Sequence, residues 1–281
     1  MLSTNSKLPA NFQFSQSSLQ DFVDCQRRFQ LRYIQRLVWP AVKAEPALEN
    51  ELYLQRGAQF HQIAHQHLLG IPAEKLDRMA AEDQKLSQWW RNFIDNGPDL
   101  SDYAQHPETT LSAPMGDDRL VAKYDLIAIK SPQAVIYDWK TARKRPKRKW
   151  LVDKLQTRVY AYLLVRAGAQ LNAGQPIEAD EVEMVYWFSE FPDQPARFPY
   201  SAEQFAKDEA YLSGLIAETK NLGDEDAPRT DDEWRCKYCL YRSLCNRGKQ
   251  AGPLDEMDLF GEAEEAFEIE LDFEQISEIE Y

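Results

Sequence analysis

No run of about 18 apolar residues occurs in this chain of 281 residues, so the sequence predicts no membrane-spanning helix. Residues 1–11 contain one lysine and no apolar segment, and we therefore expect no secretory signal and a cytoplasmic location. A Gly-x-x-x-x-Gly-Lys-Ser/Thr motif is also absent, which argues against a nucleotide-driven motor in this chain. Hydrophobic residues make up 43% of the sequence, enough to form a substantial buried core.

Basic residues are missing from the end of the chain. Residues 255–281 contain 12 acidic side chains and no lysine or arginine, whereas the rest carries 34 acidic and 33 basic side chains. The net charge of −13 therefore comes from this tail, and a nearly neutral body can still present a basic groove. Because hydrophobic residues recur among its acids, we expect the flexible tail to cover that groove or to bind a protein partner, unless it is only a solvated extension.

The hydrophobic pattern divides the chain into four regions. These are an N-terminal helical region (1–100), a core (101–221), a cysteine segment (222–252) and the acidic tail (253–281). Strands and helices alternate in the core, which predicts an α/β protein, and residues 119–129 and 134–140 are typical of a β-hairpin. Capping-box patterns at 17–20 and 201–204 predict helix starts, and residues 150–167 predict a single helix.

Two acids and a lysine lie close together in the predicted hairpin. Asp138 and Lys140 share one face of a strand because alternate side chains point the same way, and Asp125 lies on the preceding strand. Two carboxylates suit Mg²⁺ or Mn²⁺, and such a cation with a nearby ammonium suits phosphodiester hydrolysis. Taken alone, Asp138 and Lys140 also fit a solvated ion pair at a strand end.

The neighbouring predicted helices add polar side chains with a spacing of four residues. Gly57 and His61 share one helical stripe, and Gln156 and Tyr160 share another on the helix after the hairpin. His61 is the candidate metal ligand on the first helix. Gln156 and Tyr160 can contact the lysine, the metal or a DNA strand, although an ordinary polar–aromatic helix pair has the same spacing.

The four cysteines form a C-x₂-C-x₅-C group, Cys236, Cys239 and Cys245, and a distant single residue, Cys25. Nothing in the sequence indicates secretion, so metal binding is favoured over disulfides. The residues themselves leave a zinc site and an iron–sulfur cluster open.

Taken together, Gly-x-x-x-His, Asp125, Asp138-x-Lys140 and Gln-x-x-x-Tyr resemble the RecB-like PD-(D/E)XK nucleases from about residue 15 to residue 245. The resemblance implies an α/β core with a central mixed β-sheet flanked by helices. It implies metal binding by His61, Asp125, Asp138 and the backbone of Trp139, catalysis by Lys140, and a site lined by Gln156 and Tyr160. The family often has a small glycine near the first acid, whereas Lys123 and Tyr124 precede Asp125 here.

The cysteine pattern resembles the iron–sulfur staple of AddB and of the CRISPR-associated RecB-like exonucleases. In those proteins a [4Fe–4S] cluster joins an N-terminal cysteine to a C-terminal triplet, which implies a cluster on Cys25, Cys236, Cys239 and Cys245. The segment Cys25-Gln26-Arg27-Arg28-Phe29 resembles the family's Cys-Pro-Arg-Lys-Phe, with Gln26 in place of the proline. Such a cluster would link the N-terminal helical region to the cysteine segment and so enclose the nuclease core. Zinc is the alternative metal for the four cysteines.

The family implies a DNA substrate, single-stranded or with overhangs, in CRISPR adaptation or in DNA repair and recombination. A basic run directly after Lys140 is expected to bind the phosphates of the DNA: Arg143, Lys144, Arg145, Lys147, Arg148 and Lys149. Trp150 and Tyr160 could stack on bases. The alternative is a non-catalytic DNA-binding or scaffold subunit, stabilised by zinc or by an iron–sulfur cluster.

Overall fold

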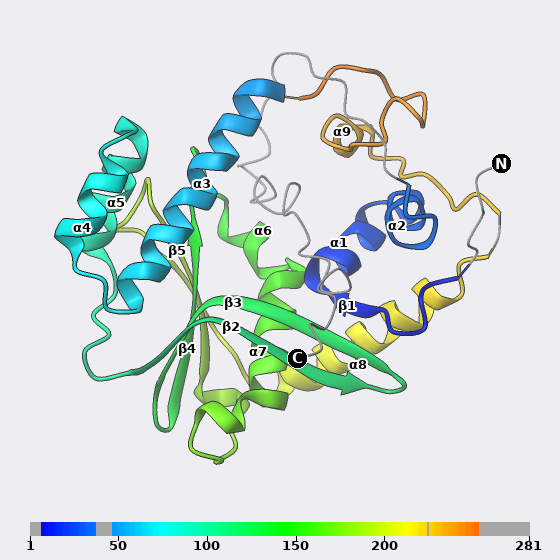
Figure 1. Ribbon diagram of the computed structural model, residues 1–281. Helices are drawn as coiled ribbons and strands as arrows, with labels where there is room; N and C mark the ends of the chain where they lie inside the picture. The colour runs from blue at the N-terminus through cyan, green and yellow to red at the C-terminus, as the bar shows by residue number, and fades with distance from the viewer. Residues whose placement is uncertain (1–6, 38–46, 224, 253–281) are drawn as a thin grey trace, which may run out of the picture.

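A mixed β-sheet with helices against both faces organises the chain (Figure 1). The computed structural model describes residues 7–37, 47–223 and 225–252. Its strands are β1 (Gln13–Ser15), β2 (Ala104–Met115), β3 (Asp118–Lys130), β4 (Gln133–Lys140), β5 (Val182–Phe188) and β6 (Ala196–Pro199). Its α-helices are α1 (Gln16–Asp24), α2 (Gln26–Phe29), α3 (Ala47–Leu68), α4 (Ala73–Ala80), α5 (Gln84–Asn96), α6 (Arg148–Val152), α7 (Leu155–Ala167), α8 (Ala202–Lys220) and α9 (Glu233–Cys236).

Strand β3 is the longest strand and has three partners. The sheet order is β1-β3-β4-β5-β6, with β2 paired to β3 along nearly its whole length. Strand β3 pairs in antiparallel fashion with β4 and in parallel with β1, and β4 pairs in parallel with β5. The predicted hairpin is therefore present, and the prediction of an α/β fold with a mixed sheet is confirmed.

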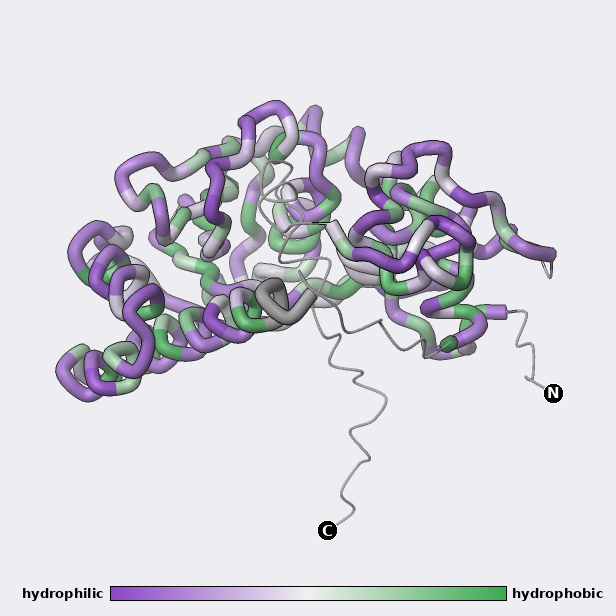
Figure 2. Tube along the Cα trace, turned by 90° about the horizontal axis from the view of Figure 1, so that it is seen from above, coloured by the Kyte–Doolittle hydropathy of each residue, from purple (hydrophilic) through white to green (hydrophobic). Residues whose placement is uncertain are grey.

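The sheet is buried on both faces, so two hydrophobic clusters hold the fold together. One face packs against α1, α7 and α8, and the other packs against α3, α4 and α5. Along β4 the side chains alternate between these clusters: Ile136 belongs to the first, whereas Tyr137 belongs to the second on the opposite face. Figure 2 shows that the outer turns of the chain are mostly hydrophilic. No helix in the described part of the chain is both long and apolar enough to cross a membrane.

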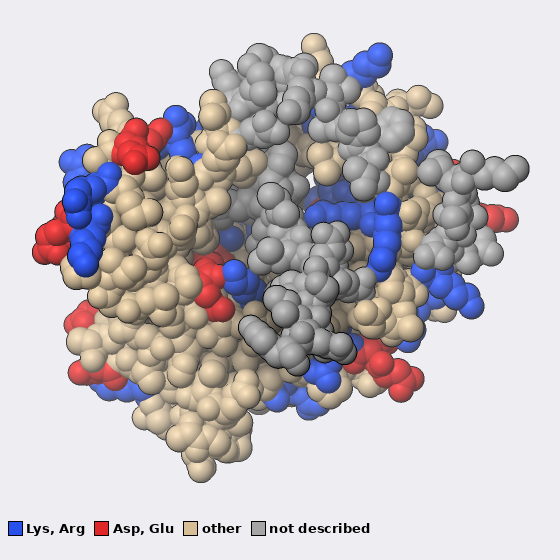
Figure 3. All heavy atoms as spheres, in the orientation of Figure 1, with Lys and Arg blue, Asp and Glu red and all other residues tan. Residues whose placement is uncertain are grey.

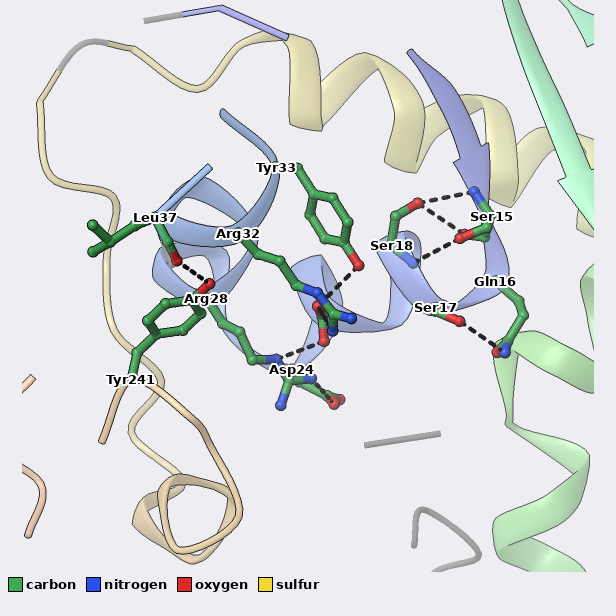
Figure 4. Close-up of polar contacts among 11 residues, drawn as sticks. Ser15, Gln16, Ser17, Ser18, Asp24, Arg28, Arg32, Tyr33, Leu37 and Tyr241 are labelled. Atoms are coloured by element: carbon green, nitrogen blue, oxygen red, sulfur yellow. Dashed lines mark hydrogen bonds and ion pairs between the residues drawn. The ribbon is translucent and has the colours of Figure 1, made fainter. Parts of the chain in front are cut away.

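Two helix predictions need correction. The capping box of α1 is formed by Ser15 and Ser18, not by 17–20: each backbone N–H donates to the other's hydroxyl, at 2.9 and 3.1 Å (Figure 4). Residues 150–167 are two helices, since Lys154 is extended and Thr157 donates to the carbonyl of Leu151 at 2.6 Å. The helix start predicted at 201–204 is that of α8, but only half of the capping box forms: the Ser201 hydroxyl accepts from the backbone N–H of Gln204, whereas the Gln204 side chain donates to Asp208.

Candidate active site

Strand β4 brings Asp138 and Lys140 to the face of the sheet that α7 covers. Both are charged yet only 3% and 8% exposed. One oxygen of Asp138 lies 2.8 Å from the Lys140 ammonium, and the other accepts a 2.6 Å hydrogen bond from the Gln156 amide. Gln156 lies in the first turn of α7, so the break after α6 places it within reach. Burying a charge is costly without such partners, and these contacts fix the Asp138 carboxylate in one orientation.

Asp125 lies on β3 and connects the hairpin to helix α3. One of its oxygens accepts the Trp139 backbone N–H at 2.7 Å, and the other lies 3.2 Å from Nδ1 of His61. Burial raises the pKa of the Asp125 carboxyl, but His61, the Trp139 N–H and Lys140 together hold that pKa below its ordinary value. The carboxyl is therefore ionised at neutral pH, as a cation ligand must be.

The structure thus brings together His61, Asp125, Asp138, Lys140 and Gln156 from α3, the hairpin and α7. Tyr160 is buried one turn further along α7, with its ring 4.7 Å from that of Tyr124. The Tyr124 hydroxyl donates to the Tyr160 carbonyl at 2.9 Å, so this pair supports the strand that carries Asp125.

The donor chemistry of the site suits a hard divalent cation. Two carboxylates, an imidazole and the Trp139 carbonyl are ligand types that Mg²⁺ and Mn²⁺ accept. Within residues 7–37, 47–223 and 225–252, however, no three His, Cys, Asp or Glu side chains lie close enough together to hold a metal ion. The acids contact His61, Lys140 and Gln156 instead.

Tyr53 and Thr141 attach helix α3 to the end of β4, and no pattern in the sequence indicated either residue. The Tyr53 hydroxyl donates to the Thr141 carbonyl, directly after Lys140. A methyl group on Gly57 would lie only 3.1 Å from the Thr141 hydroxyl, so glycine permits this close approach. These contacts fix the distance between the helix of His61 and the strand of Lys140.

The basic run predicted to bind DNA is exposed, but its members differ in their contacts. Arg145 and Arg148 donate to the carbonyls of Gln194 and Arg197, at 3.0 and 2.6 Å, so both lie along the β5–β6 turn and the edge strand β6. The Arg143 guanidinium lies over the Tyr53 ring, and the Lys149 ammonium lies 4.7 Å from the centre of the Trp150 ring. Figure 3 shows lysine and arginine side chains at several places on the face seen in Figure 1.

The four cysteines line one pocket between the N-terminal helices and the segment around α9. Cys25 lies in extended backbone between α1 and α2, and Cys236 ends α9. None forms a disulfide. Burial raises the pKa of the Cys239 thiol to about 11 and also raises the pKa values of Cys236 and Cys245. Five arginines line the same pocket: Arg28, Arg229, Arg235, Arg242 and Arg247.

Comparison with known proteins gives one family match. The family model described as the PD-(D/E)XK nuclease superfamily matches residues 13–246, which include every candidate site residue. No curated protein matches the chain.

The solved structures that resemble the chain include two crystal structures. The crystal structure of a proposed exonuclease from Eubacterium rectale is 11% identical, with a TM-score of 0.50, over 88% of this chain and 92% of that one. The crystal structure of SSO0001 is 15% identical, with a TM-score of 0.35, over 70% of this chain and 96% of that one. At such identities the likeness to the first structure concerns the fold alone.

Proposed function

The chain belongs to the PD-(D/E)XK nuclease superfamily, and from this premise we propose that it is a metal-dependent deoxyribonuclease of the RecB-like type. The observation that carries the proposal is the convergence of Asp125, Asp138 and Lys140 with His61 and Gln156. A shared fold alone would not indicate an activity, whereas these side chains supply the groups that phosphodiester hydrolysis needs.

Mg²⁺ or Mn²⁺ is the proposed cofactor, held by His61, Asp125, Asp138 and the Trp139 carbonyl. When bound, such a cation polarises the phosphate and lowers the pKa of a bound water. The hydrogen bond from Gln156 holds the Asp138 carboxylate in one orientation, which supports the proposed role of Asp138 as a ligand. The Lys140 ammonium, already beside Asp138, then stabilises the negative charge that builds up on the reacting phosphate.

Single-stranded DNA, or the overhang of a duplex, is the proposed substrate. The basic run that follows Lys140 supplies phosphate contacts, chiefly through Lys147 and Lys149, and Trp150, 39% exposed, offers a ring on which a base can stack. The proposed context is CRISPR adaptation or DNA repair and recombination.

The four cysteines are proposed to bind a [4Fe–4S] cluster, as in the AddB and CRISPR-associated members of the RecB-like group. Their common pocket, with all four thiols free, supports this proposal. Protein purified without oxygen should be brown and contain about four iron atoms and four labile sulfides per chain, as a cluster of this type requires. Colourless protein with one zinc per chain would reject the cluster but not the nuclease.

Digestion of end-labelled single-stranded and double-stranded DNA, with Mn²⁺ and with a chelator, tests the activity. We expect Mn²⁺-dependent shortening of the single strand and of overhangs, and no products in chelator. A blunt duplex cut as fast as the single strand would reject the substrate preference. Binding of DNA without any cleavage would favour the scaffold subunit.

A further inference from the structure

The two segments that carry the cysteines are also joined by charged side chains, of which Asp24 is buried and its arginine partners are partly exposed. Asp24 immediately precedes Cys25, and Arg235 immediately precedes Cys236. One oxygen of Asp24 accepts from the Arg235 guanidinium at 2.7 Å, which connects residues 211 positions apart. This ion pair therefore fixes the backbone of Cys25 beside that of Cys236.

Asp24 holds a second arginine with its other oxygen. Arg28 donates to it at 2.6 Å, and the Nε of Arg28 lies 2.7 Å from Asp21 on the preceding turn of α1 (Figure 4). Burial alone would lower the pKa of Arg28, but Asp21 and Asp24 raise it above its ordinary value, so the guanidinium remains charged. Arg28 and Arg235 both line the cysteine pocket.

Uncharged contacts tie the same two segments together. The Gln30 side chain, 2% exposed, donates to the Glu225 carbonyl at 2.7 Å and accepts from the Ala227 N–H at 2.9 Å. The Tyr241 hydroxyl donates to the Leu37 carbonyl at 3.0 Å (Figure 4). None of these contacts involves a thiol, so they add to whatever a metal bound by the cysteines would contribute.

We propose that Asp24 is a positioning residue that, through Arg235 and Arg28, holds the two cysteine-bearing segments side by side for metal binding. The inference rests on the proposed metal-binding role of the cysteines and adds which residue preorganises them. With Asp24 in place, the two segments that carry the cysteines already line one pocket, although no three of the thiols in the described residues lie close enough together to hold a metal ion. A metal or cluster then has only to draw the thiols together. Without Asp24, the contacts of Gln30 and Tyr241 still join the segments, but Cys25 and Cys236 lose the ion pair beside them and are held less precisely, which lowers the metal affinity.

Cobalt binding to the metal-free full-length chain tests this role. Co²⁺ coordinated by thiolates absorbs strongly in the ultraviolet and visible range, so its titration under anaerobic conditions reports the site directly. Asp24→Asn should weaken Co²⁺ binding about 10- to 100-fold, the range typical for loss of a group that orients metal ligands. The matched control is Asp226→Asn, because Asp226 is 80% exposed and pairs with Arg27 in the same region; it should bind like the wild type.

Arg235→Gln and the double variant show whether the ion pair is responsible. If Asp24 and Arg235 act together, Arg235→Gln should weaken binding similarly, and the double variant should lose less than the product of the two single effects. If circular dichroism shows that Asp24→Asn does not fold, Arg235→Gln alone tests whether the ion pair positions the cysteines. Wild-type cobalt affinity in folded Asp24→Asn, or in Arg235→Gln, would overturn the positioning role. Absence of thiolate–cobalt absorption in the wild type would instead reject the four-thiol site itself.

Discussion

At the scale of single residues, the site depends on charges that the fold buries in pairs. The Asp138 carboxylate contacts Lys140 and Gln156, and all three residues are at most 8% exposed. Removing one member of a buried pair leaves the other without compensation, so activity and local order respond together. Substitutions here must therefore be judged by cleavage and folding side by side.

Lys140→Ala should reduce single-turnover cleavage of a single-stranded oligonucleotide by about 10²- to 10³-fold, because it removes a charge that stabilises the reacting phosphate. Gln156→Leu should cost less, about 10- to 100-fold, since Gln156 acts by orienting Asp138. Both variants should retain DNA binding in a filter-binding assay. Wild-type cleavage by Lys140→Ala would reject its catalytic role.

Local patterns predict some of these residues and not others. Strand alternation alone places Asp138 and Lys140 on one face, and the hairpin explains how Asp125 comes near them. Tyr53 and Thr141 are 88 positions apart, and neither stands in a recognisable pattern. Their contact arises from the packing of α3 on β4, which sequence spacing cannot encode.

At the scale of elements, the separation between α3 and β4 depends on Gly57. A larger side chain there would press against the Thr141 hydroxyl, and overpacking of this kind costs about 1–3 kcal/mol. Gly57→Leu should therefore move His61 away from Asp125 and slow cleavage, while its circular dichroism spectrum stays helical.

Gly214→Leu is the matched control, because Gly214 lies on the exposed side of α8, where a β-carbon would meet no other atom within 4 Å. It should cleave like the wild type and gain thermal stability, since leucine favours helix more than glycine does. Equal cleavage by the two variants would show that the approach of α3 to β4 does not matter for activity.

The basic run after β4 should divide into two functional groups. Replacing Lys147 and Lys149 with glutamine should reduce the slope of log affinity against log salt by about 0.7 for each single-strand phosphate that the protein no longer neutralises. Replacing Arg145 and Arg148 should leave that slope unchanged and lower the melting temperature, because each substitution removes a hydrogen bond worth about 0.5–1.5 kcal/mol. The opposite pattern would show that the arginines contact DNA.

Element boundaries are harder to predict than the elements themselves. The hairpin and α8 carry clear local patterns, whereas β1 has three residues and β6 has four, too few for a recognisable alternation. The division of residues 150–167 into α6 and α7 depends on the bond from Thr157 to Leu151 and on the hydrogen bond between the hydroxyls of Thr157 and Tyr186. The second of these contacts forms only once β5, which carries Tyr186, is in place.

At the scale of the whole molecule, the acidic tail lies outside the described residues, and its role stays a prediction. The described chain ends at Gly252, whose N–H donates to the Lys237 carbonyl at 3.0 Å. A chain ending at Gly252 should bind and cut DNA better than the full-length chain at low salt. The difference should fade as the Debye length falls to about 8 Å near physiological salt. Equal activity at every salt concentration would exclude competition between the tail and DNA.

The central claim is that this fold holds a metal-dependent nuclease site at Asp138. Its most direct test compares wild-type protein and Asp138→Ala, both purified without oxygen, on the same end-labelled single-stranded DNA across a Mn²⁺ titration. The wild type should cleave with a rate that rises and saturates with Mn²⁺, and Asp138→Ala should show no cleavage at any Mn²⁺ concentration while still binding the DNA. Equal cleavage by the two proteins, or wild-type cleavage that persists in chelator, would contradict the account.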